Sequence, residues 1–162
     1  MSFWKIIKGL NFKQLRSLFA WFIRHPLLMM STVQATLKTF KISQKEFPHI
    51  HGKHNKANAF RHALWNVLIA KACARFSNNT QLVLNWTKRI TDWHEEFSPN
   101  EELAAAMDFH NNKIGREMYP LLHSKSVEEI TAAIKLELKE AVKVSSVSVL
   151  GRYPQQMVYL EH

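Results

Sequence analysis

Residues 58–76, "NAFRHALWNVLIAKACARF", decide the fold of this 162-residue chain. Their apolar side chains fall at helical spacing on two opposite faces: Phe60, Leu64 and Val67 on one, and Trp65, Ile69 and Cys73 on the other. A helix that is apolar on opposite sides belongs at the centre of a domain rather than on its surface. The stretch therefore predicts a buried central helix.

Polar side chains interrupt this helix where burial is expected. Asn58 and His62 lie one turn apart on the side of Trp65, and Asn66 lies beside them. A buried imidazole or amide needs hydrogen-bond partners. His62 is therefore either a satisfied core histidine or a member of a site.

The remaining sequence predicts an all-α fold, a single-domain helical bundle over residues 1–159. Glycine and proline are too few for the many turns of a β fold. We expect N-terminal amphipathic helices at about 1–45, a motif-bearing core at about 47–119, a C-terminal helix at about 126–144 and a short extended tail. Residues 160–162 resemble the remains of an expression tag.

Element boundaries follow from local signals. Pro26 opens a helix to about Phe40, and the central helix is followed by one at about 81–97. Asn100 is expected to cap the next helix, which should end at Tyr119, before Pro120. Ser126 and Glu129 form a capping box at the start of the last helix.

The charge balance suggests an anionic substrate or surface. The formal net charge is +9 with a sequence pI of about 9.8, and such a field attracts phosphodiesters, lipid headgroups or acidic proteins. The sequence has no specific nucleic-acid-binding motif. A single cysteine, Cys73, gives no disulfide framework and fits a cytoplasmic location.

The N-terminal segment resembles neither a signal peptide nor a transmembrane helix, because its longest apolar run spans only residues 18–23. Export without a recognisable signal peptide stays open. An apolar stripe runs through the segment among basic residues: Trp4, Ile7, Leu10, Leu15, Phe19 and Phe22. Such a helix can make peripheral contact with a membrane, but packing of the stripe on the domain is the favoured interpretation.

The two aspartates of the chain each precede a histidine by two residues, at Asp92 and Asp108. Helical phase places Asn111 within an apolar stripe and Asp108 at its edge, and it favours Glu95 over Asp92 as a site residue. Nearby small residues, Ala104 and Gly115, should let another helix approach closely.

Three motifs, at residues 54–66, 92–95 and 107–116, resemble a bacterial family of unknown function. That family occurs as stand-alone proteins in Bacteroidetes and as C-terminal domains of polymorphic toxins. The resemblance implies a site drawn from the matching positions: His54, Asn58, Arg61, His62, Trp65, Asn66, Asp92, His94, Glu95, Asp108, His110, Asn111, Asn112, Gly115 and Arg116. Asn58 stands where many members have aspartate, which would impair activity if that aspartate is a ligand or base.

The motifs predict a hydrolase of phosphoester substrates, either nucleic acid or phospholipid. In one form, a divalent ion such as zinc is held by His62, Glu95 and Asp108, with Asp92 and His110 as weaker ligands. In a metal-free form, His62 or His94 acts as a base oriented by Asp108. The expected catalytic residues are His62, His94, Glu95, Asp108 and Asn111, and the expected substrate-binding residues are Arg61, Arg116, Asn58 and Asn112.

Two further interpretations stay open. The Arg-His-Asp-Asn motifs could form a structural network in a non-enzymatic helical protein that binds a protein, a membrane or nucleic acid. His49, His51 and His54 are additional ligand candidates, although histidines in such a polar loop are more often solvated.

Overall fold

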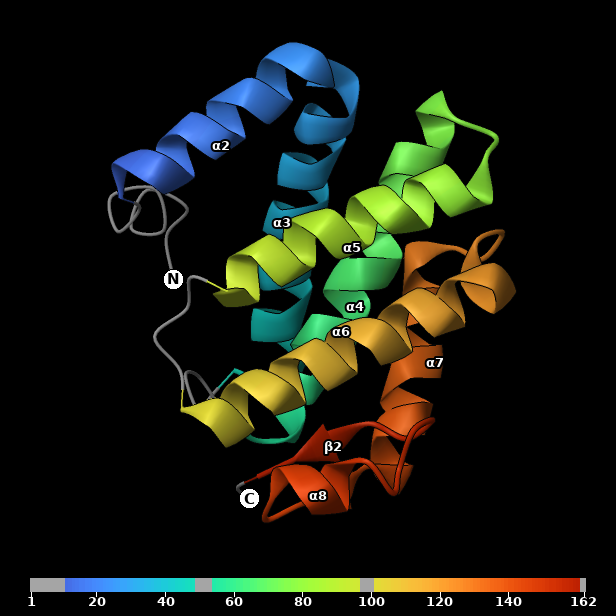
Figure 1. Ribbon diagram of the computed structural model, residues 1–162. Helices are drawn as coiled ribbons and strands as arrows, with labels where there is room; N and C mark the ends of the chain where they lie inside the picture. Colours follow the sequence, from blue (N-terminus) through green and yellow to red (C-terminus); the bar gives the residue numbers. More distant parts are fainter. Residues whose placement is uncertain (1–10, 49–53, 97–100, 161–162) are drawn as a thin grey trace.

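The computed structural model describes residues 11–48, 54–96 and 101–160 and consists mainly of helices (Figure 1). The all-α expectation is confirmed. The helices are α2 (Phe12–Arg24), α3 (Pro26–Glu46), α4 (Lys56–Cys73), α5 (Thr80–Glu96), α6 (Glu102–Leu122), α7 (Val127–Glu137) and α8 (Val147–Leu150). The short elements are the 3-10 turns η1 (Ala74–Phe76) and η2 (Leu138–Glu140) and the strands β1 (Val142–Lys143) and β2 (Val158–Tyr159).

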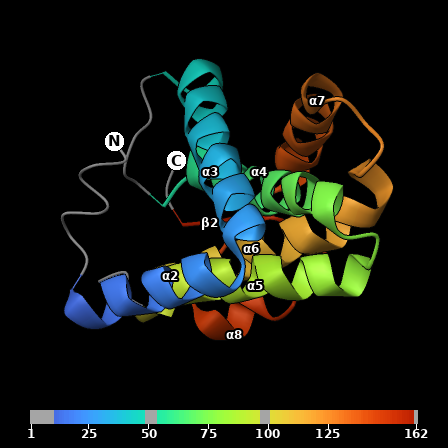
Figure 2. The same ribbon diagram turned by 90° about the horizontal axis from the view of Figure 1, so that it is seen from above.

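Helix α4 forms the centre of the bundle. The Asn55 side chain caps its first turn by accepting a hydrogen bond from the Asn58 backbone N–H. Phe60 and Leu64 on one face and Ile69 on the other are fully buried. Helices α3, α5, α6 and α7 and strand β2 all contact α4 (Figures 1 and 2). The predicted central helix is therefore confirmed.

Helices α4 and α6 approach each other closely at Gly115. A Cβ atom added there would lie only 2.4 Å from the carbonyl oxygen of Ala63. The glycine is thus required by the neighbouring backbone, as the small-residue pattern predicted. Helix α6 also continues through Pro120 to Leu122 instead of ending at Tyr119. Pro120 lies in the last turn, where little helix remains for it to disrupt.

The C-terminal region differs from the expected helix to residue 144. After the capping box at Ser126, helix α7 ends at Glu137, and the chain becomes extended at Ala141. Strand β1 pairs in parallel with β2, with Val142 opposite Val158. The residue pattern within each segment does not predict this pairing, because the hydrogen bonds of the pair join segments that are separated in sequence. Of the expected extended tail, only Val158–Tyr159 forms a strand, because Val147–Leu150 forms helix α8, which the Ser146 side chain caps.

Helix α2 begins with a capping box between Asn11 and Gln14, but its orientation contradicts the favoured interpretation of the N-terminal segment. Leu15, Phe19 and Phe22 are exposed instead of packing on the domain. The helix faces the bundle with Trp21, whose ring lies 5.7 Å from that of Trp93.

Several expected features fall outside the described residues: Trp4, Ile7, Leu10, the histidines 49 and 51, and the Asn100 cap. Glu101 occupies the N-cap position of α6. Leu160, assigned to a tag, packs against the core, and its backbone N–H donates to the His54 carbonyl at 2.7 Å. Within the described ranges, none of the helices has the length and apolarity needed to cross a membrane.

Candidate functional site

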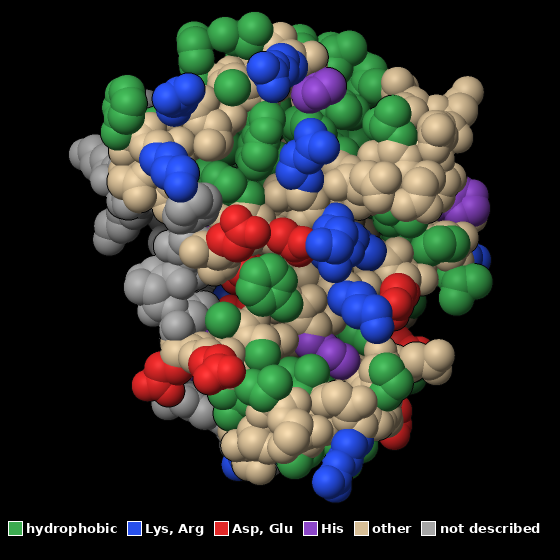
Figure 3. All heavy atoms as spheres, viewed as in Figure 1, with side chains coloured by type: hydrophobic (Ala, Val, Ile, Leu, Met, Phe, Trp, Pro, Cys, Tyr) green, Lys and Arg blue, Asp and Glu red, His purple; other side chains and the backbone are tan. Residues whose placement is uncertain are grey.

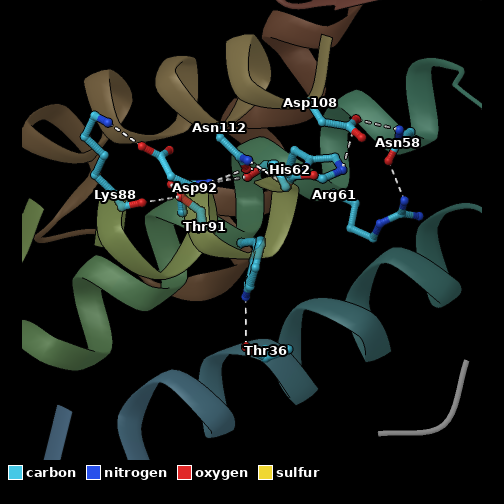
Figure 4. A network of polar contacts seen from close by, with 12 residues as sticks. Thr36, Asn58, Arg61, His62, Lys88, Thr91, Asp92, Asp108 and Asn112 are labelled. Atoms are coloured by element: carbon cyan, nitrogen blue, oxygen red, sulfur yellow. Dashed lines mark hydrogen bonds and ion pairs between the residues drawn. The ribbon is translucent and has the colours of Figure 1, made fainter. Parts of the chain in front are cut away.

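His62 lies between two carboxylates contributed by different helices (Figure 4). Its Nδ1 is 3.4 Å from Glu95 Oε1 on α5, and its Nε2 is 3.2 Å from Asp108 Oδ1 on α6. The three side chains are buried, with 6%, 4% and 3% of the surface of His62, Glu95 and Asp108 exposed. The structure therefore brings together the three residues that the motifs singled out most strongly.

Asn112 fixes the proton on one side of the His62 ring. Its Nδ2 donates to Glu95 Oε1 at 2.9 Å, and its Oδ1 lies 3.2 Å from His62 Nδ1. The same Oδ1 accepts a hydrogen bond from Asn66 Nδ2 at 2.7 Å. Because Nδ1 faces two acceptors, it is assigned as the protonated nitrogen. Proton exchange is then confined to the other nitrogen, Nε2, opposite Asp108.

Asp108 is also held from the first turn of α4. Asn58 Nδ2 donates to Asp108 Oδ1 at 3.0 Å, and Asn58 Oδ1 accepts a short hydrogen bond from the Arg61 guanidinium. An aspartate at position 58 would be unable to donate and would add a second negative charge beside Asp108. Asn58 is thus compatible with the Asp108–His62 contact, and Arg61 is anchored close to the site.

The environments of Glu95 and Asp108 shift their pKa values in opposite directions. Burial raises the pKa of Asp108, and the charge of Glu95 raises it further, more than His62 and Arg61 lower it. Burial also acts to raise the pKa of Glu95, but its contacts with His62, His94 and Asn112 bring the pKa below its ordinary value. Glu95 is therefore the ionised partner, and Asp108 is the carboxyl group that more readily holds a proton.

The two histidines of the site also differ. Burial by itself would lower the pKa of His62, but the charges of Asp108 and Glu95 raise it overall. In His94, burial dominates and lowers the pKa despite the neighbouring carboxylates. His94 is half-buried with its ring 5.3 Å from that of Trp65. Compared with an ordinary imidazole, the site favours protonation of His62 and disfavours protonation of His94.

A second set of polar side chains adjoins the cluster at Asn66. Arg116 Nη1 donates to Asn66 Oδ1 at 3.0 Å and to Thr91 Oγ1 at 3.2 Å. Asp92 pairs with Lys88 and lies 4.0 Å from Arg116, away from the two contacts of the His62 ring (Figure 4). Asn66 was expected in the site as a position of the first motif, and helical phase also placed it beside His62, whereas Thr91 was not among the expected site residues.

Two expected site residues of α6 bind the C-terminal tail instead. Asn111 Nδ2 donates to the Val158 carbonyl at 2.9 Å, and Asn111 Oδ1 accepts from the Val158 N–H at 3.0 Å. His110 Nε2 lies 2.8 Å from the carbonyl oxygen of Gln156. These contacts account for the burial of both side chains, and the catalytic role of Asn111 and the ligand role of His110 stay predictions.

The described residues contain no group of three or more His, Cys, Asp or Glu side chains that could hold a metal ion. Both ring nitrogens of His62 already face a carboxylate oxygen. Metal binding by His62, Glu95 and Asp108 would require the ring to release one of these contacts. The weaker ligand candidate Asp92 pairs with Lys88 instead.

A family model described as a domain of unknown function (DUF6973) matches residues 19–142 of the chain. The matched segment contains all three motifs, which is consistent with their resemblance to a family of unknown function. No curated protein matches the chain.

Proposed function

Because this chain belongs to the DUF6973 family of domains of unknown function, its role must be inferred from its site, and we propose that it is a hydrolase of phosphoester substrates. The observation that carries this proposal is the His62 ring between two carboxylates whose pKa values are shifted apart. Such divergence is characteristic of acid–base sites in which neighbouring groups have different protonation roles.

The His62–Asp108 pair is the proposed general acid. Glu95 and Asn112 hold the Nδ1 proton, so that the exchangeable proton lies between Nε2 and Asp108 Oδ1. The pKa values of His62 and Asp108 are both raised, so each group holds a proton more readily than an ordinary imidazole or carboxyl group does. The pair would protonate the leaving oxygen of the ester.

His94 is the proposed general base, since its lowered pKa keeps the ring neutral. It takes a proton from water, the water oxygen forms a bond to phosphorus, and the P–O bond to the leaving group breaks. The leaving oxygen receives the proton of the His62–Asp108 pair. Atoms and charge balance without a redox partner.

Arg61 is the proposed contact for the anionic phosphoryl group. It is half-buried and anchored by Asn58. Burial lowers the pKa of Arg61, and the charges of Asp108 and Glu95 partly offset this effect. A guanidinium offers several donors in a fork that matches phosphate oxygens. The net charge of +9 would favour the approach of nucleic acid or phospholipid.

A metal-dependent form of the same reaction is kept as a variant to be tested. It would use His62, Glu95 and Asp108 as ligands after one carboxylate moves away from the ring. Removal of divalent ions with a chelator, followed by addition of single metals, distinguishes the two forms. Activity that survives chelation supports the form without a metal.

A structural role is the second candidate, favoured by the complete burial and hydrogen bonding of Asn66, Thr91 and Asn112. Such a network can fix the packing of three helices without performing chemistry. The partner bound by such a scaffold would be a protein, a membrane or nucleic acid.

The first prediction separates these two candidates by isosteric substitution. In Asp108→Asn and Glu95→Gln, the oxygen that accepts each hydrogen bond is kept, whereas the charge is lost. We expect both variants to fold and to lose hydrolysis of plasmid DNA, RNA or phospholipid vesicles by about 100-fold or more. Glu117→Gln is the matched control, because Glu117 pairs with Lys113 on the exposed side of α6, away from the cluster, and it should keep activity.

The structural role makes a different prediction for the same variants. A network that only supports the fold would lose about 1–3 kcal/mol of unfolding free energy, and the wild-type protein would be inactive on every substrate. Loss of activity in variants that melt like the wild type would exclude this role. Inactivity of the wild type with and without divalent ions would contradict the hydrolase proposal.

A further inference from the structure

A rim of exposed apolar side chains follows α2 and the first turns of α3. We call it the α2 rim, and it consists of Phe12, Leu15, Phe19, Phe22, Ile23, Leu27 and Met30. Phe12 is 82% exposed and Phe19 67%. More than half of the large hydrophobic side chains exposed in the described ranges belong to this rim. An apolar patch of this kind is typical of a surface that binds a partner or a membrane.

The packing of α2 on the bundle does not account for the α2 rim. The helix packs against the core with Leu18 and with Trp21, whose ring lies 6.4 Å from Trp86 and 5.7 Å from Trp93. At 100° per residue, Phe19 and Ile23 lie on a separate flank from Trp21. The helix therefore contacts the bundle with one flank and leaves its most apolar flank in solvent.

Basic residues occupy the third flank of α2. Lys13, Arg16 and Arg24 are exposed, and the helix contains no acidic residue. Figure 3 shows Lys and Arg side chains next to hydrophobic ones over α2. A helix with aromatic and aliphatic side chains on one flank and cations beside them is typical of segments that lie in the interface of an anionic membrane.

A groove continues from the rim around the end of α2. It has a volume of about 790 Å³ and is lined by Arg24, Leu27, Phe76, Leu82 and Arg89, among others. Arg24 borders both the groove and the α2 rim. Two guanidinium groups beside apolar walls match the chemistry of an anionic headgroup joined to acyl chains.

We propose that the α2 rim and the adjoining groove bind the surface of membranes that contain anionic phospholipid. The apolar side chains would enter the interface, while Lys13, Arg16 and Arg24 would contact the phosphate groups. A second copy of the chain is a poorer occupant, because a two-fold contact through this face would bring like charges together. This binding would hold whether or not the His62 cluster catalyses a reaction.

The test measures sedimentation of the full chain with lipid vesicles. We expect the wild type to bind vesicles of phosphatidylcholine and phosphatidylglycerol in equal parts, and to bind pure phosphatidylcholine roughly tenfold more weakly. Added salt should weaken the binding. The double variant Phe19→Asp/Phe22→Asp should bind the anionic vesicles at least about tenfold more weakly, since two apolar contacts are replaced by charges.

Leu121→Asp/Leu136→Asp is the matched control, because these exposed leucines line a different groove, between α6 and α7. It should bind like the wild type, and circular dichroism checks that both variants fold. Equal binding of the wild type and the α2 variant, or no binding of the wild type to anionic vesicles, would overturn the proposal. Self-association that Phe19→Asp/Phe22→Asp abolishes, without vesicle binding, would identify a second copy as the occupant instead.

Discussion

At the scale of single residues, His62 links three helices through charge. When protonated, its ring compensates the negative charge of Glu95 on one side, and it faces Asp108 on the other. A buried ionised carboxylate without such a partner would be costly. The imidazole is therefore central to both candidate roles, because the same contacts stabilise the fold and define the proton positions.

The protonation of His62 predicts a pH dependence of stability. The pKa of His62 is raised, so its contribution is fully present below its unfolded value of about 6.5 and is lost as pH rises through the folded pKa. The contribution of Asp108 to stability is also lost as pH rises, since its raised pKa favours the protonated form. The pKa of Glu95 is lowered, so its contribution is present above about 4.5 and is lost as pH falls through the folded pKa.

Wild type and His62→Gln should therefore differ most between about pH 4.5 and 6.5, by roughly 3 kcal/mol of unfolding free energy. The difference should shrink at higher pH, as measured by urea unfolding at a series of pH values. His123→Gln, which alters an exposed histidine, should show no such dependence. A difference between wild type and His62→Gln that stays constant from acid to alkaline pH would contradict the assigned protonation.

At the scale of elements, the contact between α4 and α6 sets the geometry of the site. These helices carry His62 and Asp108, and their backbones meet where Gly115 faces Ala63. The distance between the imidazole and the carboxylate is therefore coupled to the size of the side chain at position 115.

Gly115→Ala should separate the two helices, because the new methyl group would lie 2.4 Å from a backbone oxygen. We expect a net loss of about 1–3 kcal/mol, although alanine favours helix formation by about 1 kcal/mol. Gly151→Ala is the control, since the nearest atom is 3.8 Å away and φ is −61°. Thermal melting that leaves Gly115→Ala as stable as Gly151→Ala would contradict this account.

At the scale of the whole molecule, burial is distributed unevenly. One hydrophobic core joins α3, α4, α5, α6, α7 and β2, whereas α2 has a single buried residue, Gln14, which is 5% exposed. Local opening requires little energy where few side chains are buried. The fold thus combines a well-packed centre with a helix that exposes much of its apolar surface.

Amide hydrogen exchange should reveal this difference. In α2, residues 12–24 should exchange faster than α4 by about tenfold or more, because α2 can open without disrupting the core. Vesicles of anionic phospholipid should slow exchange in α2 and leave α4 unchanged. Equal protection of both helices in the absence of lipid would contradict the distribution of stability described here.

The sequence by itself determined the helical class, the central place of α4 and the capping box at Ser126, because these depend on local spacing. It also indicated that His62, Glu95 and Asp108 belong together, through motif resemblance and helical phase. These features can be predicted from the residue types and their spacing along each helix. Their prediction does not depend on which atoms are in contact between different helices.

The tertiary structure decided the partners. Asn111 and Asn112 are adjacent, yet Asn111 bonds the backbone of Val158 and Asn112 bonds Glu95. The pairing of β1 with β2 replaced the last turn of an expected helix, and the packing of Trp21 turned the apolar flank of α2 outward. Each outcome depends on contacts between residues that are distant in sequence. The energies of these contacts exceed the local conformational preferences that can be recognised from a periodic sequence pattern.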